Sequence, residues 1–117
     1  MITSFKELDI YRRSKDLLKE IYRITERYPE YEKYNVISQL RRSILSIPLN
    51  IAEGYGRKSK EDFKRFLKIS LGSSNEVEAL LEISHELGYI KTEEYKRLSK
   101  ENEAIGKMIY RTIETWK

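Results

Sequence analysis

The most constraining feature of the sequence is an apolar repeat with a proline inside it. Apolar side chains recur there three or four residues apart, the spacing of one face of an α-helix: Val36, Leu40, Ile44, Ile47 and Ile51. Pro48 falls inside the repeat without shifting its phase. Because a proline within a helix removes a backbone hydrogen bond and costs about 3 kcal/mol, we predict a helix over residues 36–53 with a kink at Pro48.

Three further stretches show the same helical period, over residues 5–28, 60–87 and 92–116. Pro29 ends the first stretch, since a proline disfavours helical geometry in the residue before it. Gly54 and Gly56 are expected to end the second, and Gly88 the third. Candidate N-terminal caps precede the later helices: Asn35, Ser59 and Thr92.

Two sets of small or polar residues interrupt the apolar faces. The run from Gly72 to Ser74 favours the close approach of another helix. Asn102 and Thr112 fall within the apolar seam of the fourth helix, where a polar residue suits a contact that sets the register. Four helices with short connections predict an all-α, up-down-up-down four-helix bundle, formed by a single domain over residues 1–117. The length of the last two helices suggests self-association through an exposed apolar flank.

The composition narrows the possible chemistry. The chain has no cysteine and one histidine, so disulfides and zinc sites have no support, and a reducing compartment such as the cytoplasm is expected. No apolar run reaches the roughly 18 residues of a membrane span. Glu82 and His85 match one Glu-x-x-His pair, but a di-iron bundle needs two such pairs. We therefore expect no metal, no cofactor, no membrane partner and no enzymatic activity.

Positive charge is concentrated in the middle of the chain. Residues 41–68 hold eight Lys or Arg and three acids, whereas the other residues hold 15 basic and 16 acidic ones. This window therefore carries the whole of the +4 net charge. Basic side chains near a helix N-terminus are typical of sites that bind phosphate groups. The candidate nucleic-acid-binding residues are Arg41, Arg42, Arg57, Lys58, Lys60, Lys64 and Lys68.

Each candidate also has a plainer interpretation. Lys60, Lys64 and Lys68 lie on one helix face, which is also the pattern of a solvated surface. Arg65 can pair with Glu61 of the same helix. Arg41 and Arg42 either extend the basic patch or pair with acids of a neighbouring helix or subunit. The tyrosines either stack on unpaired bases or close the ends of the bundle: Tyr28, Tyr31, Tyr34 and Tyr55.

The segment around Pro48 resembles the four-helix-bundle proteins encoded in intervening sequences of bacterial 23S rRNA genes. The matching residues include Gln39-Leu40-Arg41-Arg42, Ser46-Ile47-Pro48, Asn50-Ile51-Ala52-Glu53-Gly54, Arg57, Ser59, Phe66-Leu67, Gly72-Ser73 and Leu87-Gly88-Tyr89-Ile90. The chain departs from the family pattern at Tyr11, Asn35 and Ser43-Ile44. The resemblance implies a ring-shaped homopentamer. It also implies kinship with accessory proteins of diversity-generating retroelements, which bind nucleic acid and a reverse transcriptase.

Two hypotheses follow. The first is a non-catalytic homo-oligomer that binds RNA or DNA through its basic surface, without reading a specific base sequence. The second is a protein-interaction scaffold, in which the acidic half of the third helix meets the basic half of that helix in a neighbouring subunit, or another protein. The acidic end of that helix motivates the second: Glu76, Glu78, Glu82 and Glu86.

Overall fold

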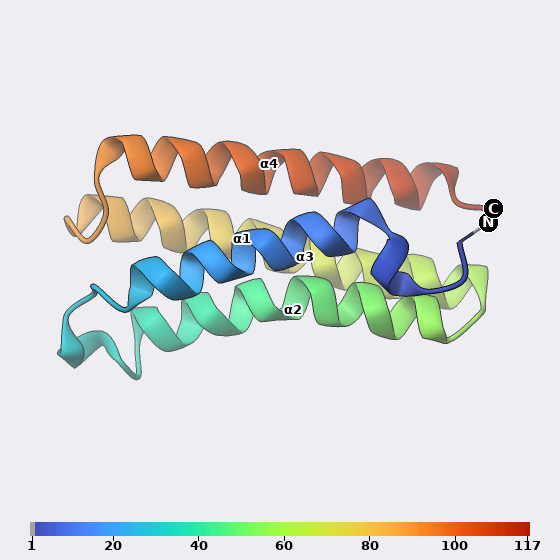
Figure 1. Ribbon diagram of the computed structural model, residues 1–117, viewed down its shortest axis with the longest axis horizontal. Helices are drawn as coiled ribbons and strands as arrows, with labels where there is room; N and C mark the ends of the chain where they lie inside the picture. The colour runs from blue at the N-terminus through green and yellow to red at the C-terminus, as the bar shows by residue number, and fades with distance from the viewer. Residues whose placement is uncertain (1) are drawn as a thin grey trace.

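The computed structural model describes residues 2–117, so Met1 of the predicted domain lies outside the described residues. It contains four long helices and, among these residues, no strand (Figure 1). The long helices are α1 (Asp9–Thr25), α2 (Val36–Gly56), α3 (Lys60–Glu86) and α4 (Thr92–Thr115). Two short 3-10 helices, η1 (Phe5–Glu7) and η2 (Glu30–Glu32), precede α1 and α2. The predicted all-α four-helix bundle is confirmed.

Each long helix packs against two others. α2 contacts α1 and α3, and α4 contacts α3 and α1, so the helices follow one another around a shared core in chain order. The apolar repeat of α2 faces this core, where Leu40, Ile44, Ile47 and Ile51 are fully buried. None of the helices within residues 2–117 combines the length and the hydropathy needed to cross a bilayer.

The first helix is shorter than predicted. Residues 5–7 form η1, and Leu8 is extended and buried before α1 begins at Asp9. The other end of α1 lies at Thr25, where Arg41 donates hydrogen bonds to the Tyr22 carbonyl and the Thr25 hydroxyl at 3.2 and 2.9 Å. A basic side chain that satisfies carbonyls at a helix C-terminus stabilises that end. The prediction of helix over residues 5–28 was therefore wrong at both ends.

α2 continues through Pro48 to Gly56 (Figure 1), and the kink at Pro48 stays a prediction. The predicted role of Gly54 in ending the helix was wrong. Gly54 is buried against α3, and a Cβ atom built there would lie 2.6 Å from Cβ of Phe66. The residue with left-handed geometry after α2 is Lys58, with a φ of 60°. Gly54 therefore permits close packing of α2 on α3.

Small polar residues of α3 hold the neighbouring helices close, as predicted. Ser70 donates a hydrogen bond to the Ile47 carbonyl at 2.9 Å, and Ser73 donates one to the Ser46 hydroxyl at 2.8 Å. Gly72 itself faces open space. These contacts join α2 and α3 without any ion pair between the two helices among residues 2–117.

The polar residues in the seam of α4 behave differently from each other. Asn102 is buried and exchanges two hydrogen bonds with Ser74 of α3, at 2.9 and 3.2 Å. The predicted register contact is confirmed there. Thr112 donates instead to the Met108 carbonyl of its own helix, so the same prediction was wrong at Thr112.

Only one of the three predicted N-terminal caps forms. Ser59 accepts a hydrogen bond from the Asp62 backbone N–H at 3.3 Å, whereas Asn35 forms no side-chain cap. At the start of α4 the cap position belongs to Lys91, whose backbone N–H donates to the Glu94 carboxylate at 3.2 Å. A carboxylate in the first turn takes the capping role predicted for Thr92.

Candidate nucleic-acid interface

The predicted lysines occupy the first three turns of α3. We call Lys60, Lys64 and Lys68 the lysine face. Lys60 and Lys68 are exposed and Lys64 is half-buried. Among residues 2–117, none of the three takes part in an ion pair. With a rise of 1.5 Å per residue, the lysine face extends over about 12 Å of the helix.

Two arginines flank Phe66 beside the lysine face. The guanidinium carbons of Arg57 and Arg65 lie 5.1 and 4.5 Å from the centre of the Phe66 ring. Arg57 donates to Glu53 at 2.9 Å, and Arg65 donates to Asp62 at 3.3 Å. The prediction that Arg65 pairs with Glu61 was therefore wrong. Each guanidinium has five N–H donors, so both arginines retain donors while their positions are fixed.

Arg65 is a candidate that the sequence interpretation missed, because it was assigned to a local ion pair. It lies over the ring of Phe66, its neighbour in α3, and Arg57 beyond the end of α2 contacts the same ring. The i, i+4 spacing of the lysines gave no indication of this arrangement.

Arg41 and Arg42 lie apart from the other candidates. They precede Arg57 by about 16 residues of continuous helix, a separation of roughly 24 Å along α2. Arg41 is half-buried, stacks on Tyr22 at 4.7 Å and binds the end of α1. Within residues 2–117 it pairs with no acid of a neighbouring helix, so that part of the alternative was wrong, whereas pairing with an acid of another subunit stays a prediction. Arg42 is exposed.

A pocket of about 580 Å³ opens at the end of the bundle where the α2–α3 connection, the first described residues and the end of α4 meet (Figure 1). We call it the end pocket. Its lining includes the aromatic residues Tyr55, Phe63 and Trp116 and the basic residues Lys58 and Lys60. No Asp or Glu side chain lines it among residues 2–117. It therefore combines apolar surface with positive charge.

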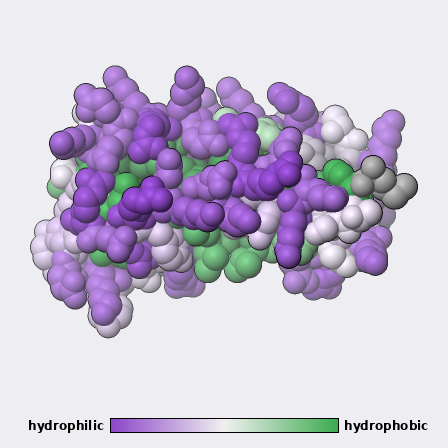
Figure 2. All heavy atoms as spheres, viewed as in Figure 1, coloured by the Kyte–Doolittle hydropathy of each residue, from purple (hydrophilic) through white to green (hydrophobic). Residues whose placement is uncertain are grey.

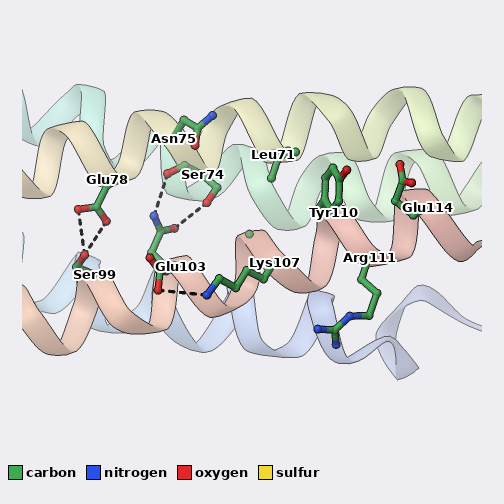
Figure 3. A pocket seen from close by; sticks show the side chains of 12 residues that line it. Leu71, Ser74, Asn75, Glu78, Ser99, Glu103, Lys107, Tyr110, Arg111 and Glu114 are labelled. Carbon is green, nitrogen blue, oxygen red and sulfur yellow. Dashed lines mark hydrogen bonds and ion pairs between the residues drawn. The ribbon is translucent and has the colours of Figure 1, made fainter.

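A larger groove of about 760 Å³ runs between α3 and α4 (Figure 3). Its walls carry Glu78, Glu103 and Glu114 against Lys107 and Arg111. Lys107 is already paired with Glu103 at 3.7 Å, and Glu78 accepts hydrogen bonds from the Ser99 hydroxyl. This excess of carboxylates disfavours a polyanion, so the groove between α3 and α4 is a poor site for nucleic acid.

An apolar patch lies on the outer surface of α2. Leu45 and Leu49, one helical turn apart, are 38% and 57% exposed, and Figure 2 shows a hydrophobic area over the middle of α2. The Ser70–Ile47 hydrogen bond places Ile69 of α3, 44% exposed, at the same level of the bundle. We call Leu45 and Leu49 the apolar patch.

Two of the four candidate tyrosines lie within the ends of the bundle, and the other two are exposed. Tyr28 is buried, and burial raises the pKa of its hydroxyl. Tyr55 is half-buried in the end pocket. Tyr31 and Tyr34 are 74% and 82% exposed, at the opposite end of the bundle from the lysine face. Tyr28 and Tyr55 thus help to close the ends of the bundle, whereas Tyr31 and Tyr34 project into solvent.

The single histidine lies in a setting built from aromatic and hydroxyl groups. His85 stacks on Tyr95 with the ring centres 5.0 Å apart, and its Nε2 atom lies 3.0 Å from the Thr92 hydroxyl. Within residues 2–117, no group of three or more His, Asp or Glu side chains is arranged to hold a metal ion.

Comparisons with known proteins agree with the fold. A family model described as 23S rRNA-intervening sequence protein matches residues 6–111. The chain is similar to a crystal structure of a protein of unknown function from the S23 ribosomal protein family of Bacteroides thetaiotaomicron, with 28% identity and a TM-score of 0.83. That match covers 91% of this chain and 96% of the other. No curated protein matches the chain. The chain belongs to the 23S rRNA-intervening sequence protein family.

Proposed function

We propose that this protein is a non-catalytic homo-oligomer that binds RNA or DNA through the α2–α3 end of the bundle. The observation that supports this most is the lysine face itself, three lysines on successive turns of one helix that take part in no ion pair within residues 2–117. A row of lysines without carboxylate partners attracts a phosphate backbone, because binding there breaks no internal ion pair.

The neighbouring groups add to this surface. Arg57 and Arg65 keep guanidinium donors available on either side of Phe66, and a fixed guanidinium suits phosphate oxygens. Lys58 extends the positive charge to the α2–α3 connection. Nothing in this set forms a base-reading module, so we propose binding to the backbone without sequence specificity.

Self-association is the second part of the proposal, and the apolar patch supports it. Leu45 and Leu49 expose apolar side chains on a chain whose surface is otherwise rich in charge. Such a patch on a small helical protein is typical of a subunit contact. An assembly with several copies of the lysine face would bind a long polyanion more tightly than one copy alone.

Charge reversal tests the proposal. The triple variant Lys60→Glu, Lys64→Glu and Lys68→Glu is compared with Lys19→Glu, Lys96→Glu and Lys100→Glu, three exposed lysines elsewhere. Both variants change the net charge equally. We expect the first to weaken binding to a labelled RNA by about a hundredfold or more and the second by much less. Equal losses, or no binding by the wild type at low salt, would refute the proposal.

A protein-interaction scaffold is the second candidate, favoured by the mixed charges of the groove between α3 and α4 (Figure 3). In that case the same charge reversal changes the mass of the assembly while nucleic-acid binding stays negligible throughout. Light scattering with and without RNA separates the two candidates, because it reports both assembly and binding.

A further inference from the structure

The end pocket has an aromatic lining that its own contacts hold in place. Phe63 is buried and meets Trp116 edge-on at 4.8 Å with an interplanar angle of 71°. Tyr55 approaches Trp116 at 6.3 Å and 74°, and its hydroxyl donates a hydrogen bond to the Ile2 carbonyl at 3.0 Å. Tyr55 and Trp116 are only half-buried. Parts of two fixed rings therefore remain open to a flat, apolar ligand.

Positive charge lies at the edge of these rings. Lys58 and Lys60 both line the end pocket and stand on either side of Ser59, the N-terminal cap of α3. Ser59 satisfies the backbone N–H groups of Asp62 and Phe63, at 3.3 and 2.9 Å. The N–H groups of Lys60 and Glu61 precede these in the first turn, where backbone donors have no partner within the helix. Lys58 and Lys60 thus line the end pocket next to the first turn of α3, where the helix dipole favours an anion.

Aromatic rings beside lysines suit one chemical class of ligand, a nucleotide. The base stacks on aromatic side chains and the phosphate takes the cations, as in single-strand binding sites. The volume of about 580 Å³ lies within the range of about 300–1,000 Å³ that is common for small-ligand sites. A base inside a duplex cannot enter such a pocket without leaving its stack, whereas the base at a single-stranded end can.

We propose that the end pocket binds an unpaired terminal nucleotide, with the base against Tyr55 and Trp116 and its phosphate at Lys58 and Lys60. The inference rests on the proposed function and adds to it a preference for single-stranded ends. Lys60 belongs both to the end pocket and to the lysine face, so a strand that follows Lys64 and Lys68 along α3 reaches the pocket at Lys60.

Trp116 gives this site its own signal, because it is the single tryptophan of the chain. The probe is a single-stranded RNA tetranucleotide with a 5′-phosphate, titrated at low salt while tryptophan fluorescence is followed. We expect saturable quenching by this probe. A blunt duplex of the same composition should bind, as a fluorescent label on it reports, without comparable quenching. Inorganic phosphate alone should leave the fluorescence unchanged.

Two variants connect the signal to the residues. Lys58→Gly removes one cation from the pocket at a backbone position that favours glycine, so loss of folding does not confuse the result. It should weaken tetranucleotide binding about fivefold, as expected for one exposed charge pair. The control Lys96→Gln, an exposed lysine of α4 outside the pocket, should leave both the affinity and the amplitude of quenching unchanged.

The outcomes separate this inference from the proposed function. Binding of labelled RNA without tryptophan quenching, or equal quenching by the duplex, would overturn the inference and leave the proposed function standing. Absence of binding by any nucleic acid at low salt would overturn both. Quenching that persists unchanged in affinity in Lys58→Gly would contradict the phosphate position.

Discussion

The α1–α4 pair and the α2–α3 pair of this bundle use their charged side chains in opposite ways. Three ion pairs link α1 or its C-terminal end to α4: Arg13–Glu101, Arg97–Glu20 and Arg27–Glu94. Across the α2–α3 contact, small side chains and serine hydrogen bonds join the helices instead. The charged groups of α2 and α3 pair only within their own helix or have no ionic partner within residues 2–117.

This difference concerns how the two pairs of helices are held together. Exposed ion pairs contribute only about 0–1 kcal/mol each, yet they neutralise the surface that they occupy. The α2–α3 side carries the lysine face, which takes part in no ion pair within residues 2–117, and also the apolar patch. The two features that support the proposed function therefore lie on the half of the molecule that is held together without interhelical ion pairs.

The largest effect is expected at the apolar patch. Replacing Leu45 and Leu49 with glutamine should dissociate the proposed assembly, so that the mass in solution falls several-fold to that of the 14.0 kDa chain. Thermal stability should change little if the variant is compared as a monomer, because both side chains are already exposed. Light scattering measures the mass.

Tyr110→Gln on α4 is the control, since Tyr110 is 56% exposed on the other half of the bundle. It should leave the mass unchanged. A wild-type protein that already has the mass of one chain, or a patch variant with the mass of the wild type, would refute the assignment of the contact to α2.

Gly54→Ala should give the next largest effect, on the free energy of unfolding. The added Cβ atom would lie 2.6 Å from Cβ of Phe66, so α2 and α3 must move apart, at a cost of about 1–3 kcal/mol. Gly56→Ala is the matched control, because nothing lies within 4 Å of its Cβ position. Chemical denaturation measures both, and equal stabilities of the two variants would contradict the close packing at Gly54.

On the α1–α4 side, Glu94→Ala should reduce stability by about 1 kcal/mol through loss of the cap on α4. The backbone hydrogen bond from Lys91, aided by Arg27, lowers the pKa of Glu94. A carboxylate whose pKa is lowered in the folded state stabilises that state above its unfolded pKa, near 4.3. This stability disappears as the pH falls through the folded pKa.

The difference between wild type and Glu94→Ala should therefore be full at pH 7 and shrink below about pH 4. The control is Glu93→Ala, an exposed neighbour in the same first turn. Denaturation at a series of pH values checks the trend. A difference that does not vary with pH would exclude the carboxylate as its source.

The smallest effect is expected at Lys58, where a substitution should increase the free energy of unfolding. Lys58 adopts a φ of 60°, which strains a residue with a side chain, so Lys58→Gly should raise the free energy of unfolding by up to about 1 kcal/mol. Thermal unfolding measures this. A loss of stability would mean that the lysine side chain contributes contacts to the fold that outweigh the strain.

The sequence predicted the parts of the fold that depend on local periodicity. The repeat of α2 and the polar seam residue Asn102 were predicted because burial of a helix face leaves a regular pattern in the chain. Gly54 was misinterpreted because a glycine near a helix end fits termination and close packing equally well. Only the position of Phe66 on the next helix distinguishes these two roles.

The candidate site was predicted in part for the same reason. The lysine face follows from i, i+4 spacing along one helix. The role of Arg41 at the end of α1 depends on contact between different helices, and so does the contact of Arg57 with Phe66. The end pocket brings together residues from both ends of the chain and from the α2–α3 connection, which no local pattern indicates.

The salt dependence of RNA binding tests the central claim most directly. For wild-type protein we expect the logarithm of the binding constant to fall linearly with the logarithm of salt concentration, between about 50 and 200 mM. Neutralising Lys60, Lys64 and Lys68 with glutamine should reduce that slope by about 2–3, as expected when three phosphate contacts are lost. An unchanged slope, or no binding at the lowest salt, would contradict a nucleic-acid interface on the lysine face.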